Sequence, residues 1–574
     1  MDFKMRIATD IAALNVGFSV NDIYQMIEIP PFDKGDYAFP CFKLAKTFKK
    51  SPNNIASELA LGFSCPFAEL RAEGAYLNFF IDKALFARET IKSIIESGEN
   101  YGASDFLRGQ KIVMDYSSPN IAKPFHVAHV PTTVIGHALY NILKFLGANV
   151  TSVNHLGDWG TQFGKMITAY KNWGSETAVE KNGVTELAGL YVRFHDEAEQ
   201  NPALDDEARA WLLKMEQGDK EALALWRLFR DISLNEYKNN IYKRLGVDFD
   251  YYTGESFYND KMSAVVETLR AKGVLEESGG AMIVNLEEYD MPPCLILRSD
   301  GGTLYPTRDI AAAFYRKETF DFDKCLYITC MDQNLHFAQW FKVIEVLGCD
   351  WANGLVHIPL GQISFEDGKL STRKGNVVLL ENLLDEAVSK TLAIINEKNP
   401  LLENKDEVAE MVGVGAVIFN NMYSSRIKDN VFAWDRALNF EGESGPYVQY
   451  THARACSILD KGVCLLSPRD TADRAELSYD FDSALLDDEY SVALIRLLAN
   501  YPEKLKECAV KYEPFILSRA LIEICQAFNK FYNNNIVLTN DIPLRKARLM
   551  LVYSVKTVLK GGLLLLGINA PSRM

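Results

Sequence analysis

The sequence lacks the marks of several protein classes. Its 10 cysteines are scattered and form no CxxC pair, so zinc is not expected and no metal held by the protein is predicted. The opening residues MDFKMRIATD contain no apolar signal-peptide core, and no apolar run is long enough to cross a bilayer. Repeats and low-complexity segments are absent as well. These absences predict a reduced, soluble, cytoplasmic protein with no membrane partner.

A surplus of positive charge is also missing. The chain has 61 Lys and Arg against 76 Asp and Glu, a net charge of −15, which argues against a basic coat for nucleic acid. Local patches decide such contacts, however, and Lys43, Lys46, Lys49 and Lys50 form one. A solvated helix face explains these lysines equally simply. With 574 residues, the chain is too long for one core, so roughly two to four domains are expected.

Histidine is scarce, yet it is concentrated. Three of the eight histidines lie between residues 126 and 137, where the apolar run KIVMDYS gives way to a helical pattern. The N-terminus of a helix offers unpaired N–H groups and a partial positive charge. The imidazoles of His126 and His129 add donors aimed at an anion. This combination predicts a phosphate-binding site and nucleotide chemistry.

The same region has the order strand, helix, strand. KIVMDYS predicts the first strand and NVTSVNHLG the second. The helix between them has Pro131 in its first turn and Gly147 as its stop. A right-handed parallel crossover is implied. Ligands of such sheets bind at the carboxyl ends of the strands, which is where residues 115–129 are expected.

Three domains are predicted. Residues 1–105 are expected to form a small α+β module, with a helical pattern near 43–61 and a strand in 74–82. Residues 106–403 are expected to form a Rossmann-type α/β domain with a parallel sheet, interrupted around 170–290 by a charged helical insertion. Residues 404–574 carry helical patterns and are expected to form an all-α helical bundle.

A second site candidate is SFEDGKLSTRKGNVV, residues 364–378. It places small hydroxyls and three cations between two glycines, a composition suited to a mobile loop that holds a triphosphate. A solvated basic turn is the plainer explanation. The triphosphate explanation is favoured because the histidine pair lies upstream in the same α/β domain. The two elements can therefore close on one ATP from opposite sides.

The HxxH pair followed by KLSTRKG resembles HIGH and KMSKS, the two signatures of class I aminoacyl-tRNA synthetases. Within that class the chain resembles arginyl-tRNA synthetase from its N-terminal module to its last residues, in segments such as SSPNIAKPFH, NHLGDWGTQFG, TRDIAAAFYR and FEGESGPYVQYTHAR. The resemblance implies that L-arginine and ATP, with Mg²⁺, give arginyl-adenylate and pyrophosphate. The arginyl group then passes to the 3′ end of tRNA(Arg). A monomer is also implied.

The resemblance assigns catalytic roles to Lys123, His126, His129, Lys369 and Ser371. The second lysine of KMSKS is Thr372 in this chain, and Lys123 is expected to supply the missing cation from the other wall of the site. Residues assigned to ATP binding are Ala128, Gly136, Thr372, Arg373 and Lys374.

Arginine recognition needs planar acceptors, because the guanidinium is always charged and presents five donors in a fork. The resemblance assigns this role to Asp115, Ser117, Asn120, Tyr305, Asp309 and Gln333. Two of these have plainer explanations. Asp309 could be a first-turn acid of a helix that begins at Pro306, and Asp115 could be a turn residue at the end of a strand.

For tRNA, the resemblance assigns Tyr76 and Asn78 to an unstacked base of the D-loop, which an aromatic face and an amide suit. A half-buried strand is the alternative. Tyr447, Tyr450 and Met574 are assigned to anticodon binding in the helical C-terminal domain. A helix start that happens to carry two tyrosines would look the same.

Two residues depart from the family pattern. Ala128 replaces the glycine of HIGH, and we expect its methyl group to crowd the adenine at a cost of roughly 1–3 kcal/mol. Pro131 stands where an arginine is common. These departures leave a second function open, a synthetase-like protein that binds tRNA or arginine with weak or no catalysis. A ligase for cysteine or glutamine lacks support, because the zinc ligands of the cysteine enzyme are missing and the pocket residues are acidic.

Overall fold

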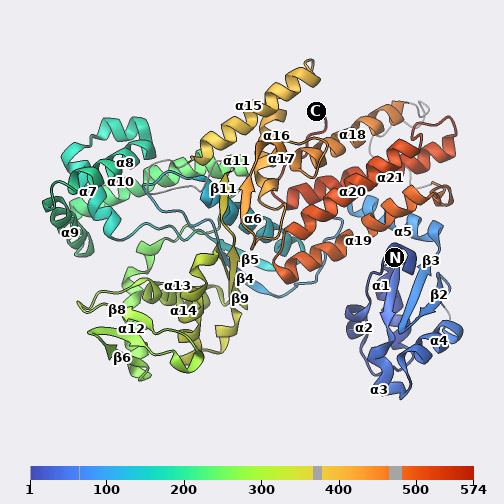
Figure 1. Ribbon diagram of the computed structural model, residues 1–574, viewed down its shortest axis with the longest axis horizontal. Coiled ribbons are helices and arrows are strands. Elements are labelled where there is room, and N and C mark those ends of the chain that lie inside the picture. Colours follow the sequence, from blue (N-terminus) through green and yellow to red (C-terminus); the bar gives the residue numbers. More distant parts are fainter. Residues whose placement is uncertain (1, 64, 366–377, 465–480) are drawn as a thin grey trace.

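The computed structural model describes residues 2–63, 65–365, 378–464 and 481–574. At its centre lies a parallel sheet with the strand order β10-β9-β4-β5 (Figure 1). The strands are β4 (Lys111–Asp115), β5 (Asn149–Val153), β9 (Lys324–Cys330) and β10 (Leu355–Leu360). Because β4 and β5 pair in parallel, the crossover predicted for this region is confirmed.

Helix α6 (Val130–Phe145) makes that crossover. Pro131 lies in its first turn, as expected, and the helix ends just before Gly147, whose φ of 92° requires glycine. Its buried face includes Val134, Ala138 and Ile142, which recur at helical spacing and pack with the core around the sheet. The N-terminus of α6 therefore lies beside the carboxyl end of β4.

A long excursion separates β5 from β9. Helices α7 to α10 gather at one end of the molecule, and a second lobe holds the antiparallel sheet β6-β7-β8 beside α12, α13 and α14 (Figure 1). The prediction of a helical insertion did not include β6 and β7. The elements are α7 (Thr161–Trp173), α8 (Glu176–Ala198), α9 (Ala203–Glu216), α10 (Lys220–Glu236), the π-helical turn η5 (Tyr237–Tyr242), α11 (Lys243–Leu245), α12 (Met262–Ala271), β6 (Leu275–Ser278), β7 (Ala281–Val284), β8 (Cys294–Leu297), α13 (Tyr305–Phe320) and α14 (Asn334–Val346).

The N-terminal module is an antiparallel sheet, β1-β3-β2, covered by helices. The helix predicted over 43–61 is divided at Lys49, whose left-handed φ of 51° ends α3, and Ser51 caps the start of α4. Lys4 pairs with Glu503 at 2.7 Å and so ties the module to the C-terminal helices. Its elements are α1 (Phe3–Ala12), α2 (Val20–Met26), β1 (Tyr37–Pro40), α3 (Ala45–Phe48), α4 (Pro52–Gly62), β2 (Ala68–Glu73), β3 (Tyr76–Ile81) and α5 (Lys83–Ser97).

The C-terminal part is a helical bundle (Figure 1). One short strand, β12 (Asn430–Phe432), pairs in parallel with β11 (Ile363–Phe365). The helices are α15 (Leu380–Lys398), α16 (Lys405–Asn420), α17 (Trp434–Ala437), α18 (Gly445–Cys464), α19 (Glu489–Lys511), α20 (Phe515–Asn534) and α21 (Ile542–Leu565). In the described ranges, no helix combines the length and the apolar character that a bilayer crossing requires.

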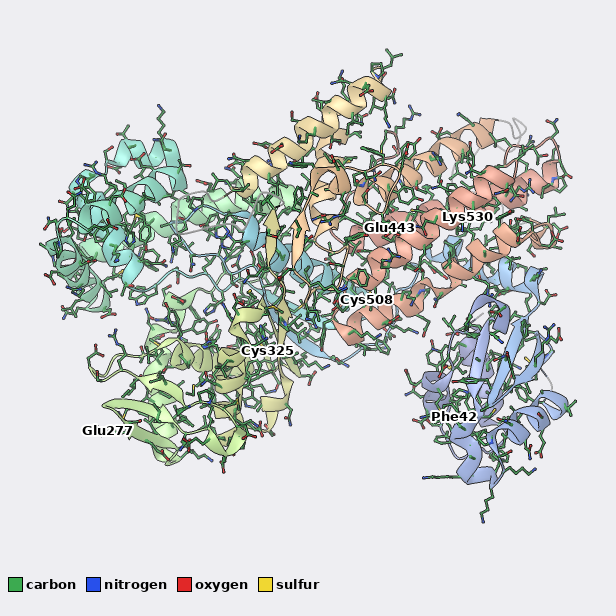
Figure 2. All side chains as sticks on the ribbon, viewed as in Figure 1. Phe42, Glu277, Cys325, Glu443, Cys508 and Lys530 are labelled. Atoms are coloured by element: carbon green, nitrogen blue, oxygen red, sulfur yellow. The ribbon has the colours of Figure 1, made fainter. Side chains whose placement is uncertain are left out.

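The structure describes the side chains of nine of the 10 cysteines, and all nine are free thiols. Cys325 lies in the central sheet and Cys508 in helix α19 (Figure 2). Burial raises their pKa to about 11 and about 12. The pKa of each of the other seven is also raised by burial.

Candidate functional site

The segment between β4 and α6 has an unusual backbone. Ser117, Ser118 and Ala122 all adopt left-handed conformations, with φ of 71°, 47° and 59°. Each such residue costs about 1–2 kcal/mol relative to the right-handed region, because Cβ crowds the following carbonyl oxygen. The surrounding structure must therefore impose this conformation, which turns the chain sharply at the carboxyl edge of the sheet.

His126 and His129 stack on each other at the end of this segment, with ring centroids 3.7 Å apart. The backbone N–H of His126 donates to Nδ1 of His129 at 3.1 Å, which assigns the proton of the neutral His129 ring to Nε2. Burial, together with the charges of His126 and Lys123, lowers the His129 pKa to about 3. Burial also lowers the His126 pKa. At neutral pH both imidazoles are uncharged hydrogen-bond donors.

Lys123 lies beside these rings. Its ammonium group is 5.4 Å from the ring centroid of Tyr191 on α8, and burial lowers its pKa. The structure thus brings Lys123, His126 and His129 together at the N-terminus of α6, where unpaired N–H groups and a partial positive charge favour an anion.

The second signature loop falls on residues outside those described, which include Lys369, Ser371, Thr372, Arg373 and Lys374. Its C-terminal flank nevertheless meets the histidine segment. The N–H of Val127 donates to the carbonyl of Val378 at 3.1 Å, and the N–H of Leu380 donates to that of Phe125 at 2.9 Å. The chain that leaves the loop therefore runs against His126, as convergence of the two signatures requires.

Asp115, the last residue of β4, faces a buried cation. Nη2 of Arg316 donates to its Oδ2 at 2.7 Å, and the hydroxyl of Ser118 donates to Oδ1 at 2.8 Å. Asp115 is 6% exposed and Arg316 1%. The charge of Asp115 is therefore already balanced inside the protein. Arg316 lies seven residues after Asp309 on α13, two helical turns along the same face, and this spacing could have marked it as a candidate in the sequence.

Asp309 lies just beyond the first turn of α13, because the helix begins at Tyr305, one residue before the predicted start. Its Oδ2 accepts a hydrogen bond from Nε2 of His336 on α14 at 2.6 Å. Both side chains are partly exposed, Asp309 at 26% and His336 at 30%. Tyr305 (67% exposed) and Gln333, which follows β9, are open to solvent. Asp309 can therefore exchange His336 for a ligand.

A buried carboxyl group that the sequence did not single out lies behind Asp309. Glu255 is 3.5 Å from Arg308. The Glu255 pKa is raised to about 7, because burial and the charges of Asp309 and Asp158 outweigh the lowering by Arg308. Gly254 makes this packing possible, because a Cβ there would lie 2.5 Å from Asp158. No local pattern in the sequence marks Glu255.

The other residues predicted between β4 and the middle of α6 are two assigned to arginine and two assigned to ATP. Ser117 and Asn120 lie in the strained segment, Ser117 buried and Asn120 exposed. Ala128 is exposed in the short turn before α6. Gly136 lies further along α6, where a Cβ would be 2.5 Å from the ring of Tyr116. Packing against that ring explains the glycine without ATP.

The residues assigned to tRNA lie far from the histidines in sequence and differ in exposure. Tyr76 on β3 is partly exposed and meets Phe42 edge-on at 6.1 Å, whereas Asn78 is 4% exposed. Tyr447 on α18 is buried and accepts a hydrogen bond from Asn529 at 2.9 Å.

Tyr450, one helical turn further along α18, is 37% exposed, and the guanidinium of Arg454 lies 4.9 Å from its ring centroid. The carbonyl of Met574 accepts a hydrogen bond from Asn399 at 3.1 Å. Tyr450 and Arg454 therefore offer an accessible aromatic and cationic surface on the helical bundle.

Comparison with known proteins agrees with this arrangement. The family model "tRNA synthetases class I (R), catalytic domain" matches residues 90–434. "Arginyl tRNA synthetase N terminal domain" matches residues 2–81, and "DALR anticodon binding domain" matches residues 448–574. Together these matches cover most of the chain.

Two relatives and one solved structure extend the match. Arginine–tRNA ligases from Clostridioides difficile and Alkaliphilus metalliredigens are 51% and 49% identical to this chain, each over 100% of both sequences. The solved arginyl-tRNA synthetase of Thermus thermophilus aligns with a TM-score of 0.82 at 25% identity, covering 100% of this chain and 99% of that one. These comparisons give no support to a binding protein without catalysis. The chain belongs to the arginyl-tRNA synthetase family.

Proposed function

We propose that this chain is an arginine–tRNA ligase, which activates L-arginine with ATP and transfers it to tRNA(Arg). One observation carries the proposal. Neutral imidazole donors and a lysine lie at the start of α6, where an anion would bind, while an exchangeable carboxylate, Asp309, lies beyond the end of the neighbouring strand β9, where a cation would bind. A site with both features fits a triphosphate and a guanidinium.

In the proposed reaction, a carboxylate oxygen of arginine attacks the α-phosphorus of ATP and pyrophosphate leaves, which gives arginyl-adenylate. A terminal ribose hydroxyl of the tRNA then attacks the arginyl carbonyl and AMP leaves. Lys123, His126 and His129 stabilise the charge that develops on the α-phosphate. Lys369, Ser371 and their neighbours hold the pyrophosphate. Mg²⁺ would accompany ATP as a ligand of its phosphates.

Arginine is held by Asp309, with Tyr305 and Gln333 beside it and Ser117 and Asn120 at the amino-acid end. Asp309 has the leading role because its partner His336 is partly exposed and replaceable, whereas Asp115 is held by buried Arg316. Asp115 contributes as a fixed acceptor in the wall of the pocket. The tRNA residues proposed are Tyr76, Asn78, Tyr447, Tyr450 and Met574.

ATP–pyrophosphate exchange with the purified protein tests the proposal. The assay contains L-arginine, ATP, Mg²⁺ and tRNA(Arg), and cysteine or glutamine replaces arginine in the controls. We expect exchange when the amino acid is arginine and none when it is cysteine or glutamine. A parallel charging assay should give arginylated tRNA. Binding of tRNA without exchange or charging would favour the noncatalytic alternative.

We also propose that the protein acts as a monomer in the cytoplasm. A single chain supplies Lys123, His129 and Asp309, which supports activity without a partner subunit. Light scattering after size exclusion, at the concentration of the activity assay, tests the oligomeric state.

A further inference from the structure

The end of helix α10 departs from α-helical geometry next to the strained segment. Residues Tyr237–Tyr242 form the π-helical turn η5, and both tyrosines are 1% exposed. In an α-helix, residues five apart point about 140° away from each other. The wider π turn, closed by bonds between residues five apart, brings such a pair onto one face. Tyr237 and Tyr242 both use that face to contact the segment between β4 and α6.

Tyr237 holds the part of the segment that leads to the histidines. Its hydroxyl lies 2.9 Å from the carbonyl oxygen of Asn120 and within hydrogen-bonding distance of that of Lys123. One hydroxyl proton thus serves two backbone carbonyls that flank the left-handed Ala122. The ring of Tyr237 also meets Phe125 edge-on at 5.5 Å. These contacts fix the backbone from which Lys123 and His126 project.

Tyr242 holds the other end of the segment. Its hydroxyl shares a hydrogen bond with the hydroxyl of Ser117 at 2.9 Å and accepts one from the amide of Asn154, also at 2.9 Å. The backbone of Ser117 is in the left-handed conformation, and its hydroxyl shares a hydrogen bond with the hydroxyl of Thr133 of α6 at 2.8 Å. Tyr242 therefore fixes the residue that begins the turn, on the arginine side of the site.

A third contact comes from the same helix. The hydroxyl of Ser233, which is fully buried, accepts a hydrogen bond from the N–H of Ala122 at 3.0 Å. Side chains from one helix end thus satisfy backbone groups of the segment at Asn120, Ala122 and Lys123. Strained backbone persists only where its surroundings impose it, and this set of bonds provides that constraint.

We propose that Tyr237 and Tyr242 are positioning residues for the ligase reaction, and that the π turn exists to aim both hydroxyls at the signature segment. The inference rests on the proposed function. Tyr237 acts through Lys123, whose backbone carbonyl it holds, so its hydroxyl governs the chemical step on ATP. Tyr242 acts through Ser117, so its hydroxyl governs the binding of arginine. Neither side chain touches a substrate.

The test compares Tyr237→Phe and Tyr242→Phe in tRNA-dependent exchange. Tyr237→Phe should lower kcat by about 3- to 10-fold, the effect of one lost hydrogen bond, with little change in the KM for arginine. Tyr242→Phe should raise the KM for arginine by about the same factor and leave the KM for ATP within twofold of wild type. The matched control is Tyr252→Phe, whose hydroxyl bonds to Asp248 near the surface and does not reach the segment.

Thermal unfolding of each variant separates positioning from general stability. We expect the split between kcat and KM to persist in variants whose Tm stays close to wild type. Wild-type kinetics in both variants would overturn the inference, and so would equal losses for both substrates that follow a fall in Tm. Absence of exchange in the wild-type protein would instead overturn the proposed function, so the two failures are distinguishable.

Discussion

The two walls of the site differ in the charge of the ligand group that each would bind, an anion at one and a cation at the other. The histidine wall (Lys123, His126 and His129) uses burial to keep its imidazoles neutral, with the pKa of His129 near 3. In the carboxylate wall (Asp115, Asp309 and Glu255), Asp115 and Glu255 have arginine partners, and burial raises the Glu255 pKa to about 7. Burial favours the uncharged forms of His126, His129 and Glu255.

The difference lies in what remains available to a ligand. On the histidine wall, donor hydrogens are directed by the ring-to-backbone bond and await an anion. On the carboxylate wall, Asp115 is committed to buried Arg316, and Asp309 is held only by a partly exposed histidine. The tautomer of His129 therefore determines which hydrogen the histidine wall offers to an anion. On the carboxylate wall, the partner that can be displaced determines which carboxylate binds a cation.

Removal of a donor from the histidine wall should have the largest effect. His129→Ala deletes a hydrogen donor aimed at developing charge, and kcat for exchange should fall by about 10²–10³-fold. Exchange rates at saturating ATP and arginine measure this loss. His137→Asn is the matched control, since His137 is another imidazole of α6 whose pKa burial lowers, to about 4. A similar kcat for both variants would break the distinction between site and core histidines.

Removal of the Asp309 carboxylate should have the next largest effect, on the KM for arginine. Asp309→Ala leaves the guanidinium without its charged acceptor, so the KM for arginine should rise by about 10- to 100-fold. The KM for ATP should change by less than about threefold. Asp260→Ala, which removes a carboxylate paired with Lys261 on the surface, serves as the control. Equal effects on both substrates would contradict the assignment of Asp309.

A smaller effect should appear in the pH dependence of arginine binding. Glu255 is protonated below its pKa of about 7 and ionised above it, where its charge adds to that of Asp309. The part of the arginine affinity that Glu255 contributes is therefore present above pH 7 and lost as the pH falls through 7. We expect the KM for arginine to rise by about 3- to 10-fold from pH 8 to pH 6.

Glu255→Gln should flatten that profile. Folding stability provides a second readout with the opposite slope. Because the folded-state pKa is raised, this carboxyl stabilises the protein below pH 4.5, and the contribution is lost as the pH rises through 7. Thermal unfolding of Glu255→Gln should therefore depend less on pH in this range. An unaltered KM profile in the variant would remove Glu255 from the carboxylate wall.

The smallest effect is expected at Ala128, where this chain departs from the family pattern, on the KM for ATP. Ala128→Gly should leave the KM for ATP equal or lower, by less than about fivefold, if the methyl group crowds the adenine. Titration of ATP in the exchange assay measures it. A marked rise in that KM would show that the backbone before α6 depends on alanine.

Local features of the fold were predictable, because their signals are local. The apolar period of α6 and its proline and glycine ends fixed the crossover, and the residues Lys123 to His129 come together because they lie in one short segment. The helical patterns predicted near 43–61 are present as α3 and α4, and Lys49 separates these helices with a left-handed conformation that no glycine in the sequence marks. Strand β6 escaped notice because three of its four residues are exposed.

Pairings across long separations were not predictable. Asp115 and Arg316 are 201 residues apart, and only the folded sheet and α13 bring them together. Tyr237 and Tyr242 do not share a face under helical periodicity, so a search at α-helical spacing misses them. Glu255 acquires its raised pKa from packing against other parts of the chain, which a single sequence does not reveal.

The distribution of thiols makes the protein suited to fluorescence experiments. A thiolate is the reactive form of cysteine, and burial disfavours that form at each of the nine described positions. Maleimide dyes should therefore favour a new surface cysteine over these native ones. Glu277→Cys on β6 and Lys530→Cys on α20 lie in separate lobes (Figure 2). Energy transfer between dyes there would follow interdomain movement when tRNA binds.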